Sequence, residues 1–277
     1  MEQIVLAGAS FVFGLDEIRE AFLSIGIESS FAEVPYMLKY QKISEKEKIE
    51  FTEKISENKI VVPLSEYWIS ECIKSNNCRI SKNALLASRS KKKLYSLLSI
   101  FKVPKKFDSI QQAKDFVNQT GKSIIVKPDG LFSGYGIKIS NKENIDEVEK
   151  FIFNARNVNN RALKLFEIKN NNALVTEYIF GKEYSADIFY FKGKISLVRL
   201  CKKEIVFIHG TPCTAVYQLL NPTAEIKSVL EKWCNALFEK ENISFGQFDF
   251  IEDRDVDFVP IDFAPRIGDG IEELLKC

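Results

Sequence analysis

The sequence predicts an α/β protein in which a small parallel-sheet domain precedes a two-lobed domain of helices packed on antiparallel sheets. Three patterns in its 277 residues support this prediction. Short apolar runs alternate with stretches of helical spacing through residues 1–88, which is typical of β-α-β units. A lysine-bearing strand leads into a glycine-rich turn at residues 123–139, and longer strands from residue 173 onward end in a hairpin.

Composition and charge exclude several classes of function. With 45% hydrophobic and 28% charged residues, the chain has the make-up of a soluble globular protein. Its 39 basic and 38 acidic residues give a formal net charge of +1, so no overall field attracts nucleic acid or an anionic membrane. No stretch reaches the roughly 18 apolar residues of a membrane span, and six scattered cysteines fit reduced thiols. We therefore expect a cytoplasmic protein with small-molecule partners, and homodimerisation stays open.

The first 88 residues read as one parallel-sheet domain. Strands are expected at residues 3–7, 27–34 and 60–63. A helix that ends at Gly26 follows the first strand, and a capping box at residues 44–47 opens a second helix that contains Ile49. The turn at residues 8–14 lacks the GxGxxG spacing, which argues against a nicotinamide dehydrogenase.

We place the domain boundary between residues 88 and 89, ahead of the basic stretch at residues 89–93. Leucines at helical spacing follow and stop before Pro104. A second capping box at residues 109–112 opens a helix that Gly121 ends. Together with the lysine strand, these helices predict a small lobe packed on an antiparallel sheet.

Residues 123–139 carry the strongest sign of chemistry. A strand would hold Lys127 in place, while Ser133, Gly134 and Gly136 would bring backbone N–H groups close to phosphate oxygens. The stretch is not a P-loop, because the lysine precedes the glycines. On these residues alone, an ordinary β-hairpin whose turn needs glycine explains the pattern equally well.

The remaining sequence predicts a second, larger lobe. Strands are expected at residues 173–179, 183–191, 194–201, 245–251 and 257–263, and a strongly amphipathic helix at residues 223–240. Within the closing hairpin, Asp249 and Asp262 interrupt apolar strands, where an unpaired charge is costly to bury. Two carboxylates on neighbouring strands suit Mg²⁺, and the alternative is that both face solvent on half-exposed strands.

Four features follow one another in order: a lysine ahead of a Val-Pro turn, the lysine strand with its glycine loop, the run TEYIFGKE, and two acidic strands ending in Ala-Pro-Arg. In this order the sequence resembles the ATP-grasp superfamily of the carboxylate-amine ligase type over residues 90–270. The resemblance implies a pre-ATP-grasp domain at residues 1–88 and an ATP-grasp domain at residues 89–277. The latter would divide into a lid-bearing lobe at residues 89–178 and a metal-binding lobe at residues 179–277.

The resemblance also implies the cofactors, ATP with Mg²⁺ or Mn²⁺, and the residues that hold the nucleotide. The implied contacts are Lys91 and Lys127 on phosphates, Ser133, Gly134 and Gly136 in a lid over the β- and γ-phosphates, Glu177, Tyr178 and Ile179 at the adenine edge, and Glu183 on the ribose. The alternative for Glu177 and Glu183 is a pair of solvated strand carboxylates.

The last motif, residues 262–268, resembles the family's Glu-x-Asn-Pro-Arg-x-Gly. Its first residue, Asp262, is implied with Asp249 as a metal ligand. Ala264 stands where an asparagine completes the shell of a second metal. Either Gln247 or Asp269 compensates for that change, or one metal is held firmly and the other weakly.

The expected substrate contacts follow from the same resemblance. Arg266 would place a fixed, bidentate cation over the transferred phosphoryl group. Arg199 and Lys202 border the implied carboxylate pocket, although a surface strand with solvated side chains is the alternative. His209, the only histidine, suits a phosphate contact, a proton transfer or a packing role.

We expect an ATP-dependent ligase that activates a carboxylate as an acyl phosphate, forms ADP and joins the acyl group to the amine of an amino acid or peptide-like molecule. Catalysis would depend on positioning and charge neutralisation by Mg²⁺, Lys127 and Arg266. Two alternatives stay open. The loop at residues 209–211 resembles one in bicarbonate-phosphorylating relatives, and Ala264 with a short C-terminus would fit a nucleotide-binding protein without catalysis.

Overall fold

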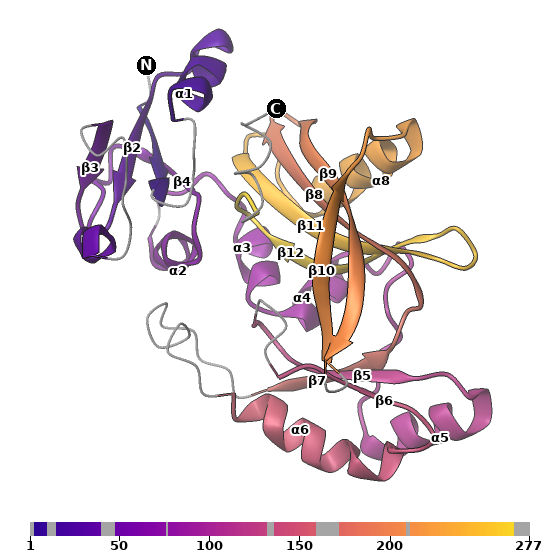
Figure 1. Ribbon diagram of the computed structural model, residues 1–277. Helices are drawn as coiled ribbons and strands as arrows, with labels where there is room; N and C mark the ends of the chain where they lie inside the picture. Colours follow the sequence, from indigo (N-terminus) through magenta and orange to yellow (C-terminus); the bar gives the residue numbers. More distant parts are fainter. Residues whose placement is uncertain are drawn as a thin grey trace.

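The computed structural model describes residues 3–9, 15–39, 48–75, 77–131, 136–158, 172–208 and 211–268. Strands within these ranges form one parallel sheet and two antiparallel sheets, which occupy different parts of the molecule (Figure 1). This arrangement confirms the predicted mixed α/β fold with an N-terminal parallel sheet.

The N-terminal sheet has the strand order β3-β2-β1-β4. Its region contains β1 (Ile4–Ala7), α1 (Leu15–Ser24), β2 (Ser29–Glu33), η2 (Pro35–Lys39), β3 (Ile49–Phe51) and β4 (Ile60–Pro63). Every residue of β1 and β4 is buried, which explains their continuous apolar sequences.

One predicted element of this region is wrong. The capping box at residues 44–47 lies outside the described residues, but Ile49, expected in its helix, belongs to strand β3 and pairs with Phe31 of β2. The Thr52 N–H donates to the carbonyl of Glu33 at 2.9 Å and extends this pairing. Ladder hydrogen bonds and the burial of Ile49 therefore outweigh the local helical signal.

The small lobe carries a three-stranded antiparallel sheet of order β6-β5-β7, as predicted. Its elements are α5 (Ile110–Thr120), β5 (Ile124–Pro128), β6 (Lys138–Ser140), η4 (Ile145–Glu147), α6 (Val148–Arg156) and β7 (Ala173–Glu177). The predicted capping of α5 is confirmed: Ser109 Oγ accepts from the Gln112 N–H at 3.2 Å, and Gly121 ends the helix at a φ of 68°.

The large sheet is antiparallel, with the order β10-β9-β8-β11-β12. Its elements are β8 (Gly181–Phe191), β9 (Lys194–Ile208), β10 (Thr211–Leu219), α8 (Ala224–Leu237), β11 (Ile243–Asp253) and β12 (Phe258–Ala264). The predicted amphipathic helix is α8, whose Trp233 ring packs 5.6 Å from Phe248 and 5.7 Å from Phe250 of β11. The sequence prediction missed β10 and ended β9 at residue 201.

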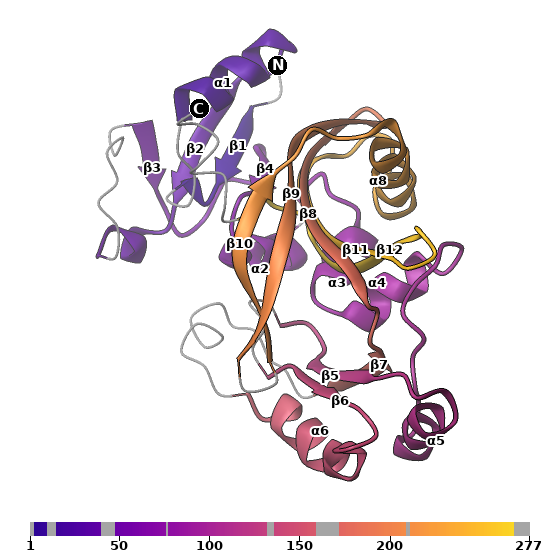
Figure 2. The ribbon, with the colours of Figure 1, turned by 45° about the vertical axis from the view of Figure 1, so that its right-hand side comes forward.

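Helices α2 (Glu66–Lys74), α3 (Lys82–Ser88) and α4 (Lys91–Leu97) connect the N-terminal sheet to the small lobe, and α3 and α4 pack against β12. The ribbon of β9 and β10 extends towards the small lobe, where Lys138 Nζ donates to Thr211 Oγ1 at 3.0 Å (Figure 2). Among the helices in the described ranges, none has the length and apolar character needed to cross a membrane.

Candidate functional site

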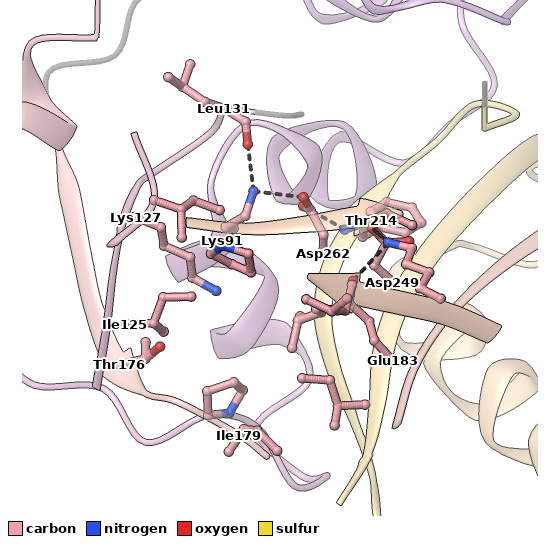
Figure 3. Close-up of a pocket in the computed structure, with 18 of the residues that line it drawn as sticks. Lys91, Ile125, Lys127, Leu131, Thr176, Ile179, Glu183, Thr214, Asp249 and Asp262 are labelled. Carbon is pink, nitrogen blue, oxygen red and sulfur yellow. Dashed lines mark hydrogen bonds and ion pairs between the residues drawn. The ribbon is translucent and has the colours of Figure 1, made fainter. Parts of the chain in front are cut away.

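A pocket of about 490 Å³ lies between the small-lobe sheet and one face of the large sheet (Figure 3). Strand β5 and the segment after β7 line it from the small lobe, and β8, β9, β11 and β12 line it from the large lobe. The predicted site residues that line it are Lys91, Lys127, Glu177, Tyr178, Ile179, Glu183, Asp249, Asp262 and Arg266. Chain folding therefore brings together residues that are far apart in the sequence.

Asp249 and Asp262 stand opposite each other in the register of β11 and β12, and both line the pocket. Their side chains are 24% and 35% exposed, so they do not have the fully solvated positions of the alternative interpretation. Asp249 Oδ1 is buried and has no hydrogen-bond partner among the described residues. An unpartnered carboxylate oxygen of this kind is a suitable ligand for a hard cation.

Lys203 of β9 lies between two carboxylates of this face. Its Nζ is 2.6 Å from Asp249 Oδ2 and 3.0 Å from Glu183 Oε1, and its side chain is 6% exposed. Burial alone would lower the pKa of Lys203, but Asp249 and Glu183 outweigh burial and raise it above its ordinary value. For the Glu183 carboxyl, burial is the larger effect and raises its pKa above the ordinary value.

The sequence prediction chose Lys202 instead of Lys203, and the structure corrects this choice. Successive residues of a strand face opposite sides, so Lys202, which pairs with Tyr184 across β8, lies on the sheet face away from the pocket. The sequence held no signal that separated the two lysines. Counting back from the turn at residues 192–193 pairs Glu183 with Lys202, and the register shift between Asp187 and Ile188 moves the pairing to Lys203.

Arg199 is also placed differently from the prediction. It is buried on β9, and its Nε lies 2.5 Å from Asp187 Oδ2 of β8. Asp187 Oδ1 accepts a hydrogen bond from the Gly268 N–H at 2.9 Å. Arg199 does not line the pocket, because the ion pair holds its side chain at Asp187, which also binds the turn that follows β12.

Two further lysines face the acidic strands from the other side of the pocket. Lys91 is the first residue of α4. Its Nζ lies 3.0 Å from Asp262 Oδ2 and donates to the Leu131 carbonyl at 2.8 Å. Lys127 of β5 donates to the Tyr95 hydroxyl at 2.7 Å. Burial, followed by the nearby charge of Lys91, lowers the pKa of Lys127 to about 7.

The predicted adenine hinge begins at Glu177, the last residue of β7, and lines the pocket. The Glu177 N–H donates to the Lys105 carbonyl at 2.8 Å, and the Tyr178 N–H donates to the Ser123 carbonyl at 3.0 Å. The Glu177 carboxylate lies 2.9 Å from Lys122 Nζ. These bonds fix the hinge backbone at the border of the small lobe.

Arg266 is held by a residue of α2. Its Nε donates to Glu66 Oε1 at 2.6 Å, and Glu66 Oε2 in turn accepts from Arg89 Nη1 at 2.5 Å. Burial alone would raise the pKa of Glu66, but the two guanidinium groups outweigh burial and lower it. Glu66 therefore joins the N-terminal region to the turn that carries Arg266.

Gln247 is the structural neighbour of Ala264. The two residues pair across β11 and β12, and Gln247 Oε1 accepts from Arg266 Nη1 at 3.2 Å while its amide donates to Ser185 Oγ at 3.1 Å. Gln247 therefore supplies a polar side chain opposite Ala264. Asp269, the other residue considered for compensation, lies outside the described residues.

Two predicted residues of the glycine loop lie outside the described residues, namely Ser133 and Gly134. The same holds for His209. Gly136 is described and has a φ of 70°, and a Cβ there would be 2.5 Å from Val158 Cγ2. Both the backbone conformation and the packing thus require glycine at this position.

The residues present fit a polyphosphate with a divalent cation. Oxygen ligands are available on two neighbouring strands, and lysines that can contact phosphate surround them. Within the part of the chain that the structure describes, no group of three or more acidic, cysteine or histidine side chains could hold a metal. A cation bound by these two aspartates would therefore share its coordination with the phosphates of a ligand.

The fold of this chain has counterparts among known proteins. A model of the ATP-grasp domain matches residues 120–272. No curated protein matches the chain. Among solved structures, an L-amino acid ligase from Bacillus licheniformis has a TM-score of 0.61 and 14% identity, covering 99% of this chain and 69% of its own.

Two other structures have the same fold. The biotin carboxylase domain of 2-oxoglutarate carboxylase from Hydrogenobacter thermophilus, in complex with MgADP, ADP and bicarbonate, has a TM-score of 0.61 and 13% identity over 98% of this chain and 65% of its own. The D-cycloserine synthetase DcsG has a TM-score of 0.62 and 11% identity over 98% and 93%. The chain thus spans about two thirds of the length of the first two of these three structures and nearly all of the third.

Proposed function

We propose that this chain, which belongs to the ATP-grasp family, is an ADP-forming ligase that activates a carboxylate as an acyl phosphate and joins it to an amine. The observation that supports this proposal most directly is one pocket in which Lys91, Lys127 and Lys203 face Asp249 and Asp262. This arrangement can neutralise a triphosphate and a developing phosphoryl charge, which is the main demand of phosphoryl transfer.

The lysines and aspartates would divide the binding of Mg-ATP between them. Asp249, with its unpartnered Oδ1, and Asp262 would hold the magnesium ion, which neutralises phosphate charge when bound. Lys91 and Lys127 would contact the phosphates from the small-lobe side of the pocket. Lys203 replaces Lys202 in the proposed site because it shares the pocket face with the aspartates.

The hinge and its neighbours would bind the nucleoside. Glu177, Tyr178 and Ile179 line the pocket where the chain passes from the small lobe to the large lobe, so their backbone could contact an adenine edge. Glu183, near the start of β8, lines the pocket and would accept a hydrogen bond from a ribose hydroxyl. The proposed glycine lid consists of Ser133, Gly134 and Gly136.

Arg266 would stabilise the transferred phosphoryl group. Glu66 and Gln247 hold its guanidinium at the pocket wall, so little reorganisation is needed when negative charge develops. Glu66 also lines the pocket, which extends it towards the N-terminal region. We propose that both substrates enter from this side. One is the carboxylic acid, and the other is the amine of an amino acid or peptide-like molecule. We also propose a cytoplasmic location for the protein; the five described cysteines form no disulfide bond with one another.

An ATP-dependent hydroxamate assay over a library of carboxylic acids tests this function, because hydroxylamine traps an acyl phosphate. We expect hydroxamate and ADP with at least one acid, and a loss of roughly 100-fold for Lys127→Ala and Asp262→Asn, which remove charge neutralisation. Lys114→Ala, which breaks only an exposed ion pair with Asp146 in the small lobe, should keep the wild-type rate.

Equal hydroxamate formation by the wild type and both site variants would show that the proposed site is wrong. ADP formation with bicarbonate and without any organic acid would instead favour a bicarbonate-phosphorylating enzyme. Tight ATP binding without ADP formation across the whole library would favour a nucleotide-binding protein without catalysis.

A further inference from the structure

The carboxylates proposed to hold magnesium are already paired with ammonium groups of this chain. Lys203 Nζ lies 2.6 Å from Asp249 Oδ2. Lys91 Nζ lies 3.0 Å from Asp262 Oδ2, as Figure 3 shows. Each aspartate therefore has a lysine at one of its two oxygens. A divalent cation at the same carboxylates would be repelled strongly by both lysines.

The two lysines differ in what holds them. Lys91 also donates to the Leu131 carbonyl at 2.8 Å, so the small-lobe side helps to fix it. Lys203 has a second carboxylate partner instead, Glu183 Oε1 at 3.0 Å, and its side chain is almost fully buried between the two acids. Lys203 is thus the more strongly paired cation and lies at the aspartate whose other oxygen, Asp249 Oδ1, has no hydrogen-bond partner among the described residues.

We propose that Lys203 is an internal counter-ion that keeps divalent metal away from Asp249 until a nucleotide is bound. The inference rests on the proposed function, because it takes the polyphosphate as the ligand that competes for the lysine. In the free protein the ammonium group satisfies Glu183 and Asp249. Phosphate oxygens offer it an alternative anionic partner, and the carboxylates then become available to the metal.

This arrangement makes metal binding conditional on nucleotide binding. Without the lysine, Glu183 and Asp249 would form a pair of uncompensated carboxylates in a largely buried site, which is an environment that attracts a hard cation. Removing the positive charge should therefore increase metal affinity in the absence of nucleotide. A purely structural role for Lys203 predicts the reverse, a weakened site.

The test measures Mn²⁺ binding by the loss of the free-ion signal in electron paramagnetic resonance, with and without ADP, after subtraction of the loss that ADP causes in the absence of protein. Wild-type protein should bind Mn²⁺ at least tenfold more tightly when ADP is present. Lys203→Met, which keeps the length of the side chain without its charge, should bind Mn²⁺ without ADP at least tenfold more tightly than the wild type. Lys202→Met, one residue away on the opposite sheet face, should behave like the wild type.

Equal nucleotide-free Mn²⁺ affinities for Lys203→Met and the wild type would overturn the inference. The double variant Lys203→Met with Asp249→Asn should lose the gain, and a gain that persists in it would also count against Lys203 as the competitor at Asp249. If Lys203→Met does not fold, Lys203→Gln provides the same comparison.

The inference and the proposed function can fail separately. Hydroxamate formation by the wild type combined with unchanged Mn²⁺ affinity in Lys203→Met would leave the ligase proposal intact and remove the counter-ion role. The expected Mn²⁺ result without turnover of any acid would do the opposite.

Discussion

At the scale of single residues, the most informative side chain is Lys127. The sequence identified it as a lysine on a strand ahead of a glycine turn, and the structure buries it against Tyr95. Burial and the charge of Lys91 lower its pKa to about 7, far below that of an ordinary lysine. A lysine in this state is partly uncharged near neutral pH until an anion arrives.

Nucleotide binding should therefore take up a proton. At pH 8 roughly nine tenths of Lys127 is neutral in the free protein. Phosphate stabilises the ammonium form, so the bound state holds more protons and affinity should fall as pH rises above about 7. Calorimetric titration of ADP at pH 8 in two buffers of different ionisation enthalpy measures the uptake.

The control for this experiment is Lys127→Met, which should show weaker binding and little dependence of the heat on the buffer. If wild-type protein gives the same heat in both buffers, the lysine is already charged before the nucleotide binds, and its low pKa plays no part in binding.

The sheet face on which a strand side chain lies was the property that the sequence predicted least reliably. Lys202 and Lys203 are adjacent and chemically identical, and only the pairing of β8 with β9 decides which one faces the pocket. The strand register includes a shift between Asp187 and Ile188, so counting back from the hairpin turn does not give the facing directly.

At the scale of elements, the turn after β5 shows how backbone conformation positions a charged group. Gly130 has a φ of 94°, and a Cβ on it would overlap the carbonyl oxygen of Arg89. The same turn supplies Asp129, which accepts from Ser90 Oγ at 2.9 Å, and the Leu131 carbonyl that holds Lys91. A close approach of two backbones therefore sets the position of Lys91, the lysine proposed to contact phosphate.

Gly130→Ala should weaken ADP binding more than about tenfold, because the overlap must displace the turn that holds Lys91. Gly121→Ala is the matched control, since Gly121 has a φ of 68° but open space around a Cβ. It should cost roughly 1 kcal/mol of folding stability through backbone strain and leave ADP affinity unchanged. Isothermal titration and thermal unfolding of both variants separate the two effects, and equal ADP affinities would contradict the proposed role of the turn.

Elements with strong local signals were predicted well. The capped α5 and the amphipathic α8 occur where their sequences indicated, because caps and apolar faces are local properties. Strands β3 and β10 were not predicted. Both are outer strands of their sheets; β3 has only three residues and β10 has no buried residue, so neither shows a marked apolar pattern.

At the scale of the whole molecule, Glu66 connects three segments that are distant in sequence. It begins α2, accepts from Arg89 at the end of α3, and accepts from Arg266 in the turn after β12. The N-terminal region thereby helps to set the orientation of the arginine proposed to act on the phosphoryl group.

Glu66→Gln should destabilise the protein by roughly 3 kcal/mol, because it leaves two partly buried guanidinium groups without their carboxylate. It should also lower kcat with little change in the KM for ATP, because Arg266 loses its orientation. Chemical denaturation and steady-state kinetics measure these effects. Glu71→Gln, which removes only the exposed pair with Lys74 on the same helix, should change stability by no more than about 0.5 kcal/mol.

The lowered pKa of Glu66 gives a pH dependence with a definite sign. The carboxylate stabilises the folded state fully above its ordinary pKa, and this contribution is lost as pH falls through the lower pKa of the folded protein. Wild-type protein should therefore lose stability on acidification more steeply than Glu66→Gln. Parallel stability curves for the two proteins would show that Glu66 is not held as a charged pair.

The sequence by itself determined the α/β class, the family resemblance, the strongly capped and amphipathic helices, and nine of the residues that line the pocket. These features depend on local periodicity, on turn chemistry and on the order of motifs along the chain. The tertiary structure alone decided that Lys203 rather than Lys202 faces the aspartates, that Arg199 is buried with Asp187, and that Glu66 holds Arg266. Strand register, burial and long-range ion pairs arise only when distant segments pack together, so no local pattern in the sequence specifies them.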